Sequence, residues 1–177
     1  SMQIDNPERG FSLKLDGPLD LRLNPKSGRP ASALLKNISQ QQLEDILIQN
    51  ADERHAAIIA KSVIAKMAKT KGIETTNQLK EVIAEALGFL PNINKIDQIK
   101  KSCQRCLQAL RIEVNNEFGV LEKFLEKLPA VLDTGGRVAI LTFHSGEDRR
   151  VKKSFQSLFR LGIYSEIAAD PILPSSQ

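Results

Sequence analysis

A histidine, a serine, two acids and two arginines follow an apolar run in the stretch "ILTFHSGEDRRVKK", residues 140–153. An imidazole can relay a proton, and carboxylate and guanidinium groups can orient a polar substrate. Serine hydrolysis is disfavoured, because Ser145 lacks the G-x-S-x-G turn and only His55 and His144 could serve as its base. A structural alternative is that Ser145 caps a helix and Asp148 completes a capping box. The residues therefore predict either a catalytic cluster or an ordinary helix start.

The apolar run before these residues, "VAILTF" at 138–143, is typical of a β-strand buried on both faces. Such strands belong to parallel sheets covered by helices, and ligands bind beyond their carboxyl ends. His144 and Ser145 would then lie at the mouth of a site. Because one strand cannot form a sheet, either partner strands lie elsewhere in a longer protein or this segment is not a strand.

The middle of the chain, residues 31–132, shows mainly helical patterns. The expected N-caps of successive helices are Ser39, Asp52, and Thr75 or Thr76. One long helix is predicted over residues 95–125, before Pro129 marks a break or a new first turn. No internal repeat and no low-complexity tract interrupts this pattern.

Composition sets the class of protein. The 177 residues are 41% hydrophobic and 26% charged, as in an ordinary globular protein. No apolar run approaches the roughly 20 residues of a transmembrane helix, and the first residues do not resemble a signal peptide. We therefore expect a cytoplasmic protein with no membrane partner. The net charge of +4 is compatible with a polyanionic partner but does not require one.

The pair Cys103-x-x-Cys106 invites a metal or redox interpretation. A zinc site needs four ligands, and no second cysteine pair or nearby histidine supplies the others. We predict buried helix thiols and no metal.

Two further groups of polar residues could form a binding surface. The turn "LDGPLDLRL" carries Asp16, Asp20 and Arg22, and its structural interpretation is an Asp20–Arg22 pair on a solvent face. Gln108, Arg111 and Asn115 recur at i, i+3 and i+7 and share one helical face, as in any amphipathic helix. Seven lysines of the helical part form either a solvated face or a phosphate-contacting surface: Lys61, Lys66, Lys69, Lys71, Lys95, Lys100 and Lys101.

Three blocks of the sequence carry a family resemblance. "MQIDNPERGFSLKLDGPLDLRL", "LQALRIEVNNE" and "GGRVAILTFHSGEDRRVKK" are similar, in order and spacing, to signature blocks of the bacterial ribosomal small-subunit methyltransferase H family. The resemblance covers nearly all of residues 1–153. It implies methyl transfer from S-adenosylmethionine to N4 of a cytidine in the decoding region of 16S rRNA, with small-subunit rRNA as the partner.

The resemblance also implies a fold for the parent protein. That fold is the α/β class I methyltransferase type, a doubly wound sheet with a helical domain inserted after the fourth strand. This chain would be mostly α, with residues 138–143 as the fifth strand. It would comprise a loop segment bordering the catalytic cleft (1–30), the helical insert that recognises substrate (31–128) and the C-terminal part of the methyltransferase domain (129–177).

Residue roles follow from the matched blocks. Gln3 matches a glutamine that contacts the cofactor, and His144 and Asp148 are the expected catalytic residues, which position the target amine or relay its proton. Methyl transfer to an exocyclic amine needs such positioning and an outlet for one proton. The expected substrate-binding residues are Asp16, Asp20, Arg22, Gln108, Arg111, Asn115, Ser145 and Arg149.

The chain departs from the usual family blocks at several positions. The family usually reads "HPATRTFQALRI" where this chain has "KSCQRCLQALRI" with Cys103 and Cys106. It usually reads "SFHSLEDR" where this chain has Gly146, and it has a basic residue at the position of Ile58.

Two expectations concern the chain alone. Without the first half of the sheet it should bind S-adenosylmethionine weakly or not at all, and its unpaired strand edge should favour a homo-oligomer. The alternative to an enzyme fragment is a non-catalytic module, in which the helical part binds RNA or protein.

Overall fold

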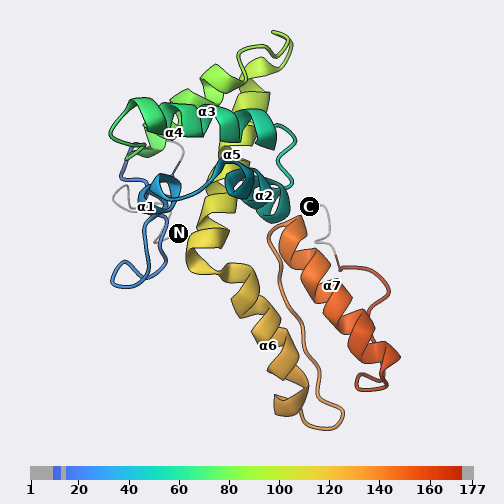
Figure 1. The fold of residues 1–177 in the computed structure, drawn as a ribbon. Helices are drawn as coiled ribbons and strands as arrows, with labels where there is room; N and C mark the ends of the chain where they lie inside the picture. Colours follow the sequence, from blue (N-terminus) through green and yellow to red (C-terminus); the bar gives the residue numbers. More distant parts are fainter. Residues whose placement is uncertain (1–9, 13–14, 173–177) are drawn as a thin grey trace. The chain divides into compact units, whose positions relative to one another are not determined.

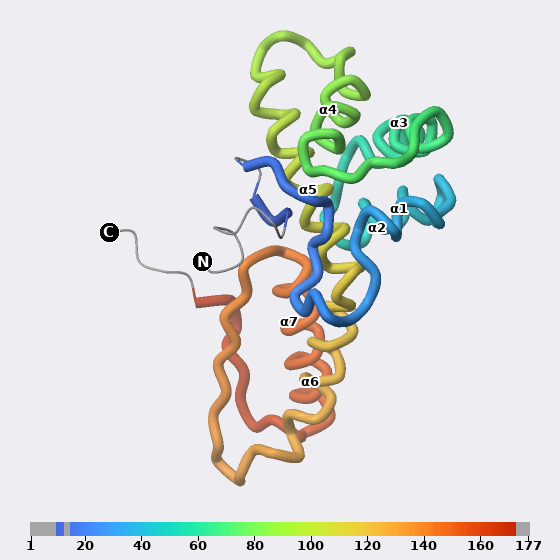
Figure 2. The backbone as a smooth tube through the Cα atoms, turned by 90° about the vertical axis from the view of Figure 1, so that its left-hand side faces the viewer, coloured from blue at the N-terminus to red at the C-terminus, as the bar shows by residue number. Residues whose placement is uncertain are grey.

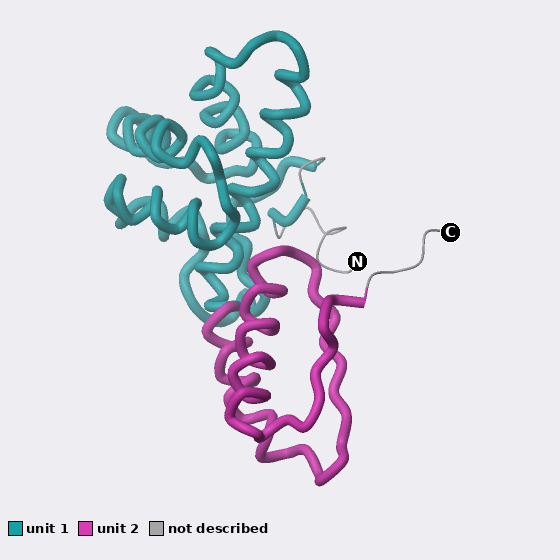
Figure 3. Tube along the Cα trace, turned by 90° about the vertical axis from the view of Figure 1, so that its right-hand side faces the viewer, with its two compact units in different colours: residues 1–117 teal, residues 118–177 magenta. Residues whose placement is uncertain are grey.

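The computed structural model describes residues 10–12 and 15–172. It contains the helices α1 (Ala31–Lys36), α2 (Gln40–Ala51), α3 (Ala56–Lys69), α4 (Thr76–Ala86), α5 (Lys95–Asn115), α6 (Glu117–Val131) and α7 (Ser145–Arg160) (Figure 1). Figure 2 follows the same chain from the side, with the blue N-terminal segment running beside α5. The chain divides into two compact units, residues 1–117 and residues 118–177 (Figure 3).

Unit 1 (residues 1–117) is a helical assembly built on α5. This helix contacts α1, α2 and α4, and α3 contacts α1, α2 and α4. The buried core includes Leu35, Leu47, Ile59, Ile83 and Leu110, each no more than 2% exposed. Burial of this many large aliphatic side chains is the main force that holds the helices together.

Two of the expected helix starts are confirmed. Ser39 opens α2 and Thr75 opens α4, each in a full capping box. In each box a hydroxyl accepts from the backbone N–H three residues on, and Gln42 or Gln78 returns the bond. Each box satisfies two backbone donors that the helix itself leaves unpaired.

The expected cap of α3 is wrong. Asp52 does not open this helix but ends α2, in a left-handed conformation with φ 50°. The residue before α3 is His55, whose backbone N–H donates to the Glu53 carboxylate at 2.9 Å. A short turn therefore separates α2 from α3, and Glu53 rather than Asp52 supplies the acceptor.

The single long helix predicted over 95–125 is also wrong. Asn116 adopts a left-handed conformation with φ 49°, which ends α5 and lets α6 begin at Glu117. Asparagine tolerates this conformation better than most residues and is a frequent helix terminator. Pro129 does not break α6, which ends two residues later at Val131.

The predicted strand at 138–143 does not form in this chain. Its backbone is extended but unpaired, and the described residues contain only one isolated bridge, between Pro18 and Thr75. An extended segment becomes a strand only when a neighbour pairs with its N–H and C=O groups. Leu141 and Phe143 are instead 79% and 83% exposed. The chain is therefore mostly α, as expected, without the β-sheet of the predicted fold.

Unit 2 (residues 118–177) consists of α6, the extended segment and α7 (Figure 3). Its buried apolar side chains among the described residues are Phe118, Leu125, Leu128 and Val151. Many others are more than 40% exposed: Val120, Phe124, Val131, Leu141, Phe143, Phe159, Leu161, Ile163 and Ile172. An apolar surface of this extent favours association, and homo-oligomerisation stays a prediction.

The prediction of buried helix thiols is confirmed. Cys103 and Cys106 are buried free thiols in α5. Burial raises the pKa of Cys103 to about 11, so its thiol is neutral at physiological pH. Among the described residues no group of three or more His, Cys, Asp or Glu side chains could hold a metal ion. None of the helices described is long and apolar enough to span a membrane.

A buried carboxylate joins the α2–α3 turn to α5. Glu53 is 3% exposed and accepts hydrogen bonds from Arg105 Nε at 2.7 Å and Ser102 Oγ at 3.1 Å, besides the His55 N–H. Burial alone would raise the pKa of Glu53, but hydrogen bonds from Arg105 and the His55 N–H outweigh burial and lower it. The charged form is thus the one that the fold favours.

Replacement of Glu53 by glutamine should lower the free energy of unfolding by about 2–4 kcal/mol, because Arg105 loses its charged partner. Since the folded-state pKa is below the unfolded one, the wild-type advantage is complete above the unfolded pKa and is lost as pH falls through the folded value. Denaturant unfolding from neutral to acidic pH measures this difference. The exposed Glu81→Gln control should change stability by less than about 0.5 kcal/mol. A pH-independent difference for Glu53→Gln would contradict the assignment.

Candidate functional site

The N-terminal loop is attached to the start of α4. The backbone N–H of Leu19 donates to Glu74 O at 2.7 Å, and that of Thr76 donates to Gly17 O at 3.0 Å. Asp16 Oδ1 accepts from the Asn77 N–H at 3.0 Å and from the Thr76 hydroxyl at 3.1 Å. The Asn77 N–H is the main cause of a lowered pKa for Asp16. Asp16, a predicted substrate-binding residue, is therefore already engaged in anchoring the loop.

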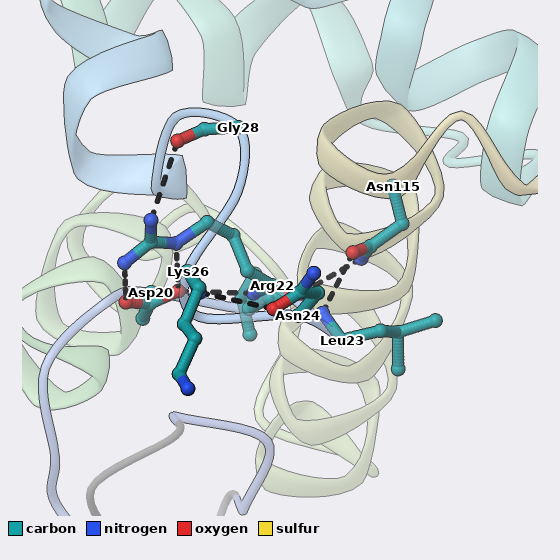
Figure 4. A network of polar contacts seen from close by, with 8 residues as sticks. Asp20, Arg22, Leu23, Asn24, Lys26, Gly28 and Asn115 are labelled. Carbon is teal, nitrogen blue, oxygen red and sulfur yellow. Dashed lines mark hydrogen bonds and ion pairs between the residues drawn. The ribbon is translucent and has the colours of Figure 1, made fainter.

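Asp20 and Arg22 form the pair that the sequence predicts (Figure 4). Arg22 Nε donates to Asp20 Oδ1 at 2.8 Å and Nη2 donates to Oδ2 at 2.7 Å. Nη1 reaches the carbonyl of Gly28 at 3.2 Å. Two parallel bonds fix the plane of the guanidinium group. About a fifth of each side chain stays exposed, so the pair remains accessible to a ligand.

Asn115 holds the same loop to the end of α5 (Figure 4). Its Nδ2 donates to Leu21 O at 2.8 Å, and its Oδ1 accepts from the Leu23 N–H at 2.7 Å. The amide therefore pairs with the backbone on both sides of Arg22. Nδ2 also donates to Arg111 O at 2.7 Å. Residues more than 90 positions apart thus meet, and the structure brings together Asp20, Arg22 and Asn115 as one polar cluster.

Arg111 spans the break between α5 and α6. Its Nε and Nη2 donate to the Glu117 carboxylate at 2.8 Å and 3.0 Å. Glu117 was not among the residues predicted from the sequence. It directly follows Asn115 and Asn116, and this pair of asparagines could have indicated a helix end. Gln108 lies one turn earlier in α5 and is partly buried.

In unit 2 the start of α7 differs from the expected capping box. The cap is His144 rather than Ser145: its backbone is extended, and its Nδ1 accepts from the Glu147 N–H at 3.4 Å. Glu147 Oε2 in turn accepts from the Phe143 N–H at 2.8 Å. Ser145 is the first residue of the helix, and the Asp148 N–H donates to His144 O at 3.2 Å. An imidazole nitrogen can replace a hydroxyl as cap acceptor because it carries a lone pair.

The His144 ring is largely enclosed, with 14% of its side chain exposed. Phe118 lies against it, with ring centroids 5.9 Å apart. Nε2 is buried, lies 3.6 Å from Glu147 Oε1, and has no hydrogen-bond partner among the described residues. Because Nδ1 accepts a hydrogen bond, the neutral ring carries its proton on Nε2. Of the other predicted site residues in α7, Asp148 is partly buried, whereas Ser145 and Arg149 are exposed.

The structure brings together Asp20, Arg22 and Asn115 in unit 1, whereas Asp16 is bonded to the start of α4. In unit 2 the candidate residues form a second cluster at the start of α7: His144, Ser145, Asp148 and Arg149. Gln3, the predicted cofactor contact, lies outside the described residues. Sequence reasoning missed Phe118 and Arg150, which contact each other beside His144. No local sequence pattern indicates such a contact. Phe118 is an ordinary apolar residue near a helix start, and Arg150 is one of several arginines.

Comparisons with known proteins identify the class. The sequence matches the MraW methylase family over residues 1–168. It is 60% identical over 177 residues to the ribosomal RNA small subunit methyltransferase H 2 of Alkaliphilus metalliredigens, covering all of this chain and 51% of that protein. It is 55% identical over 177 residues to the ribosomal RNA small subunit methyltransferase H 1 of Lachnoclostridium phytofermentans, covering all of this chain and 48% of that protein.

The chain therefore belongs to the MraW methylase family. The resemblance predicted from the three sequence blocks is confirmed. The chain spans about half the length of the curated relatives it matches.

Weak binding of S-adenosylmethionine by this chain alone stays a prediction. A cavity of about 470 Å³ lies beside α1 and α2, lined by Arg29, Ala33, Leu34, Asn37, Ile38, Gln42, Asp45, Ile46, Gln49 and Glu113. None of the predicted site residues lines this cavity. The two polar clusters are instead occupied by their own hydrogen bonds, so neither forms a ready cradle for a methyl donor.

Replacement of Asn115 by alanine should release the loop around Arg22 and lower the free energy of unfolding by about 1–3 kcal/mol. Amide hydrogen exchange should show faster exchange at Leu23, which loses its acceptor, but not at Leu19, which keeps Glu74 O. The exposed Gln104→Ala variant of the same helix is the matched control and should leave both amides unchanged. Unchanged protection of Leu23 in Asn115→Ala would refute the clamp.

Proposed function

We propose that this chain forms the substrate-facing part of an enzyme that methylates N4 of a cytidine in 16S rRNA, with S-adenosylmethionine as methyl donor and the cytoplasm as its place of action. The observation that carries the proposal is 60% identity along the whole chain to a protein named ribosomal RNA small subunit methyltransferase H 2. The parent protein would have the class I methyltransferase fold. Residues 138–143 would pair within its sheet, which accounts for an apolar segment left exposed in this chain.

Methyl transfer to an amine does not require a nucleophilic side chain on the protein. The donor supplies an electrophilic methyl group; N4 forms the new bond to carbon, the carbon–sulfur bond breaks, and N4 releases one proton. The lone pair of N4 is delocalised into the base, so the protein must orient the amine and receive that proton. These two tasks are the ones that His144 and Asp148 would perform.

The cap geometry divides the two roles. Because Nδ1 of His144 accepts from the Glu147 N–H, the neutral ring carries its proton on Nε2. Nε2 is buried in this chain and would donate to an acceptor on the base where the parent protein exposes it. The Asp148 carboxylate, in the first turn of α7, can accept the amine proton. His144 would thus orient the base, and Asp148 would hold the proton.

The polar cluster of unit 1 would contact the RNA backbone and the sugar. Asp20 occupies the Nε–Nη2 edge of Arg22 and fixes its plane, so only the remaining N–H groups of Nη1 and Nη2 would donate to a phosphate oxygen. Arg111, Gln108, Asn115, Ser145 and Arg149 would extend the substrate surface, and Gln3 would contact the cofactor. Five of the seven lysines are exposed (Lys61, Lys69, Lys71, Lys100 and Lys101) and would neutralise phosphates.

A non-catalytic module remains the second candidate for this chain, because unit 1 has its own core and its own lysine-rich surface. A module would bind rRNA without any contribution from unit 2. The effect of His144 on turnover separates the two candidates.

In the full-length protein, His144→Ala should lower methyl transfer by roughly one hundred-fold or more, with cofactor affinity nearly unchanged. His144→Asn keeps a good helix cap but removes the imidazole, so a comparable loss in this variant excludes a stability effect. Single-turnover assays on 16S rRNA substrate measure the rate. Ser157→Ala, at an exposed position of the same helix, is the matched control and should keep near-wild-type turnover. Full activity of His144→Asn would contradict a role in the reaction.

A further inference from the structure

One aromatic ring of unit 2 is held between three groups of α7. Phe118, near the start of α6, is 8% exposed. The guanidinium carbon of Arg150 lies 3.4 Å from the centroid of its ring, and the His144 ring lies 5.9 Å away, tilted by 59°. At Gly146, an added Cβ would come within 2.6 Å of Phe118 Cζ. The ring therefore occupies the space that a side chain at position 146 would need.

The cation over this ring is itself fixed. Arg150 Nε donates to Glu122 Oε1 at 3.0 Å, and Arg150 Nη1 donates to Gly146 O at 3.0 Å. The guanidinium group is thus bound by an acid of α6, by a carbonyl of α7 and by the ring face. Such a cation–π contact with a weakly hydrated guanidinium is favourable.

The polar contacts of His144 are weak by comparison. Its Nδ1 lies 3.4 Å from the Glu147 nitrogen, which is long for a hydrogen bond, and its Nε2 lies 3.6 Å from Glu147 Oε1. These two contacts alone hold the imidazole only loosely. The Phe118 contact is a further constraint on the orientation of the ring.

We propose that Phe118 is a positioning residue for His144, and that Gly146 is required because only a residue without a side chain admits the Phe118 ring. Phe118, clamped by Arg150, keeps Nδ1 of His144 on the Glu147 N–H and so keeps the proton on Nε2. The effect on methyl transfer rests on the proposed function, whereas the effect on the tautomer of His144 does not.

The tautomer can be read directly in this chain. The protein has only two histidines, and His55, which contacts Phe89 in unit 1, serves as an internal reference. Long-range ¹H–¹⁵N spectra at about pH 8.5, where an ordinary imidazole is neutral, distinguish a protonated ring nitrogen from a bare one. The wild-type chain should show His144 as a single tautomer with the proton on Nε2.

Phe118→Leu should give averaged nitrogen shifts for His144, with the His55 signals unchanged. Phe124→Leu, at an exposed aromatic of the same helix, is the matched control and should keep the single tautomer. Gly146→Ala leaves Phe118 in the sequence but displaces it, so it should resemble Phe118→Leu, and it also serves if Phe118→Leu fails to fold. A single Nε2–H tautomer in Gly146→Ala or Phe118→Leu would overturn the proposal, as would averaging in Phe124→Leu.

Turnover tests the consequence separately. In the full-length protein, Phe118→Leu should lower kcat by roughly ten- to one hundred-fold with little change in KM for the RNA, and Phe124→Leu should leave kcat unchanged. If the tautomer changes as expected but His144→Asn stays fully active, the positioning stands and the proposed function fails. If Phe118→Leu keeps the wild-type tautomer, the positioning fails whatever the activity of the His144 variants.

Discussion

The end of α5 is a constraint on which the position of the N-terminal loop depends. The left-handed residue Asn116 ends α5 at Asn115, whose amide pairs with the backbone on both sides of Arg22. Arg111 closes the turn by binding Glu117 on its far side. Backbone hydrogen bonds hold the same loop elsewhere, among them the bond from the Ala31 N–H to Asp20 O at 2.8 Å. The Asp20–Arg22 pair is thus fixed by one side chain of α5 together with the backbone of the loop.

Unit 2 follows a different principle, because few of its side chains are buried. Its local order comes from the cap of α7 and from one aromatic ring rather than from a large core. The cap uses the imidazole of His144, so the residue with the most versatile chemistry also fixes the start of the helix. Most substitutions of His144 remove both the helix cap and the imidazole. Asparagine keeps a cap and removes only the imidazole, so it separates the two properties.

Features that depend on local hydrogen bonds or on burial were predicted correctly from the sequence. Ser39 and Thr75 open helices because each has a glutamine three residues on to complete the box, and the cysteines are buried because they lie on the apolar face of α5. The Asp20–Arg22 pair follows from their spacing across a turn. Asp52 failed as a cap because the chain needed a left-handed residue to end α2, a role that its side chain does not reveal.

Other structural features depend on residues far away in the sequence, which a local pattern does not reveal. Residues 138–143 have the composition of a strand, but pairing requires a neighbour, and the described residues provide none. The apolar periodicity of 95–125 continues through the break at Asn116, so the pattern concealed a turn that the two adjacent asparagines could have indicated. The contact of Phe118 with His144 joins residues 26 positions apart and rests on the absence of a side chain at Gly146.

The central claim is that this chain belongs to an enzyme that methylates a cytidine of small-subunit rRNA. Mass spectrometry of nucleosides from purified 16S rRNA, compared between cells with and without the gene that encodes this chain, tests it most directly. The account predicts that N4-methylcytidine at one site is present with the gene, disappears without it, and returns when the intact gene is restored. An unchanged amount of N4-methylcytidine at every site in the deletion strain would contradict the account.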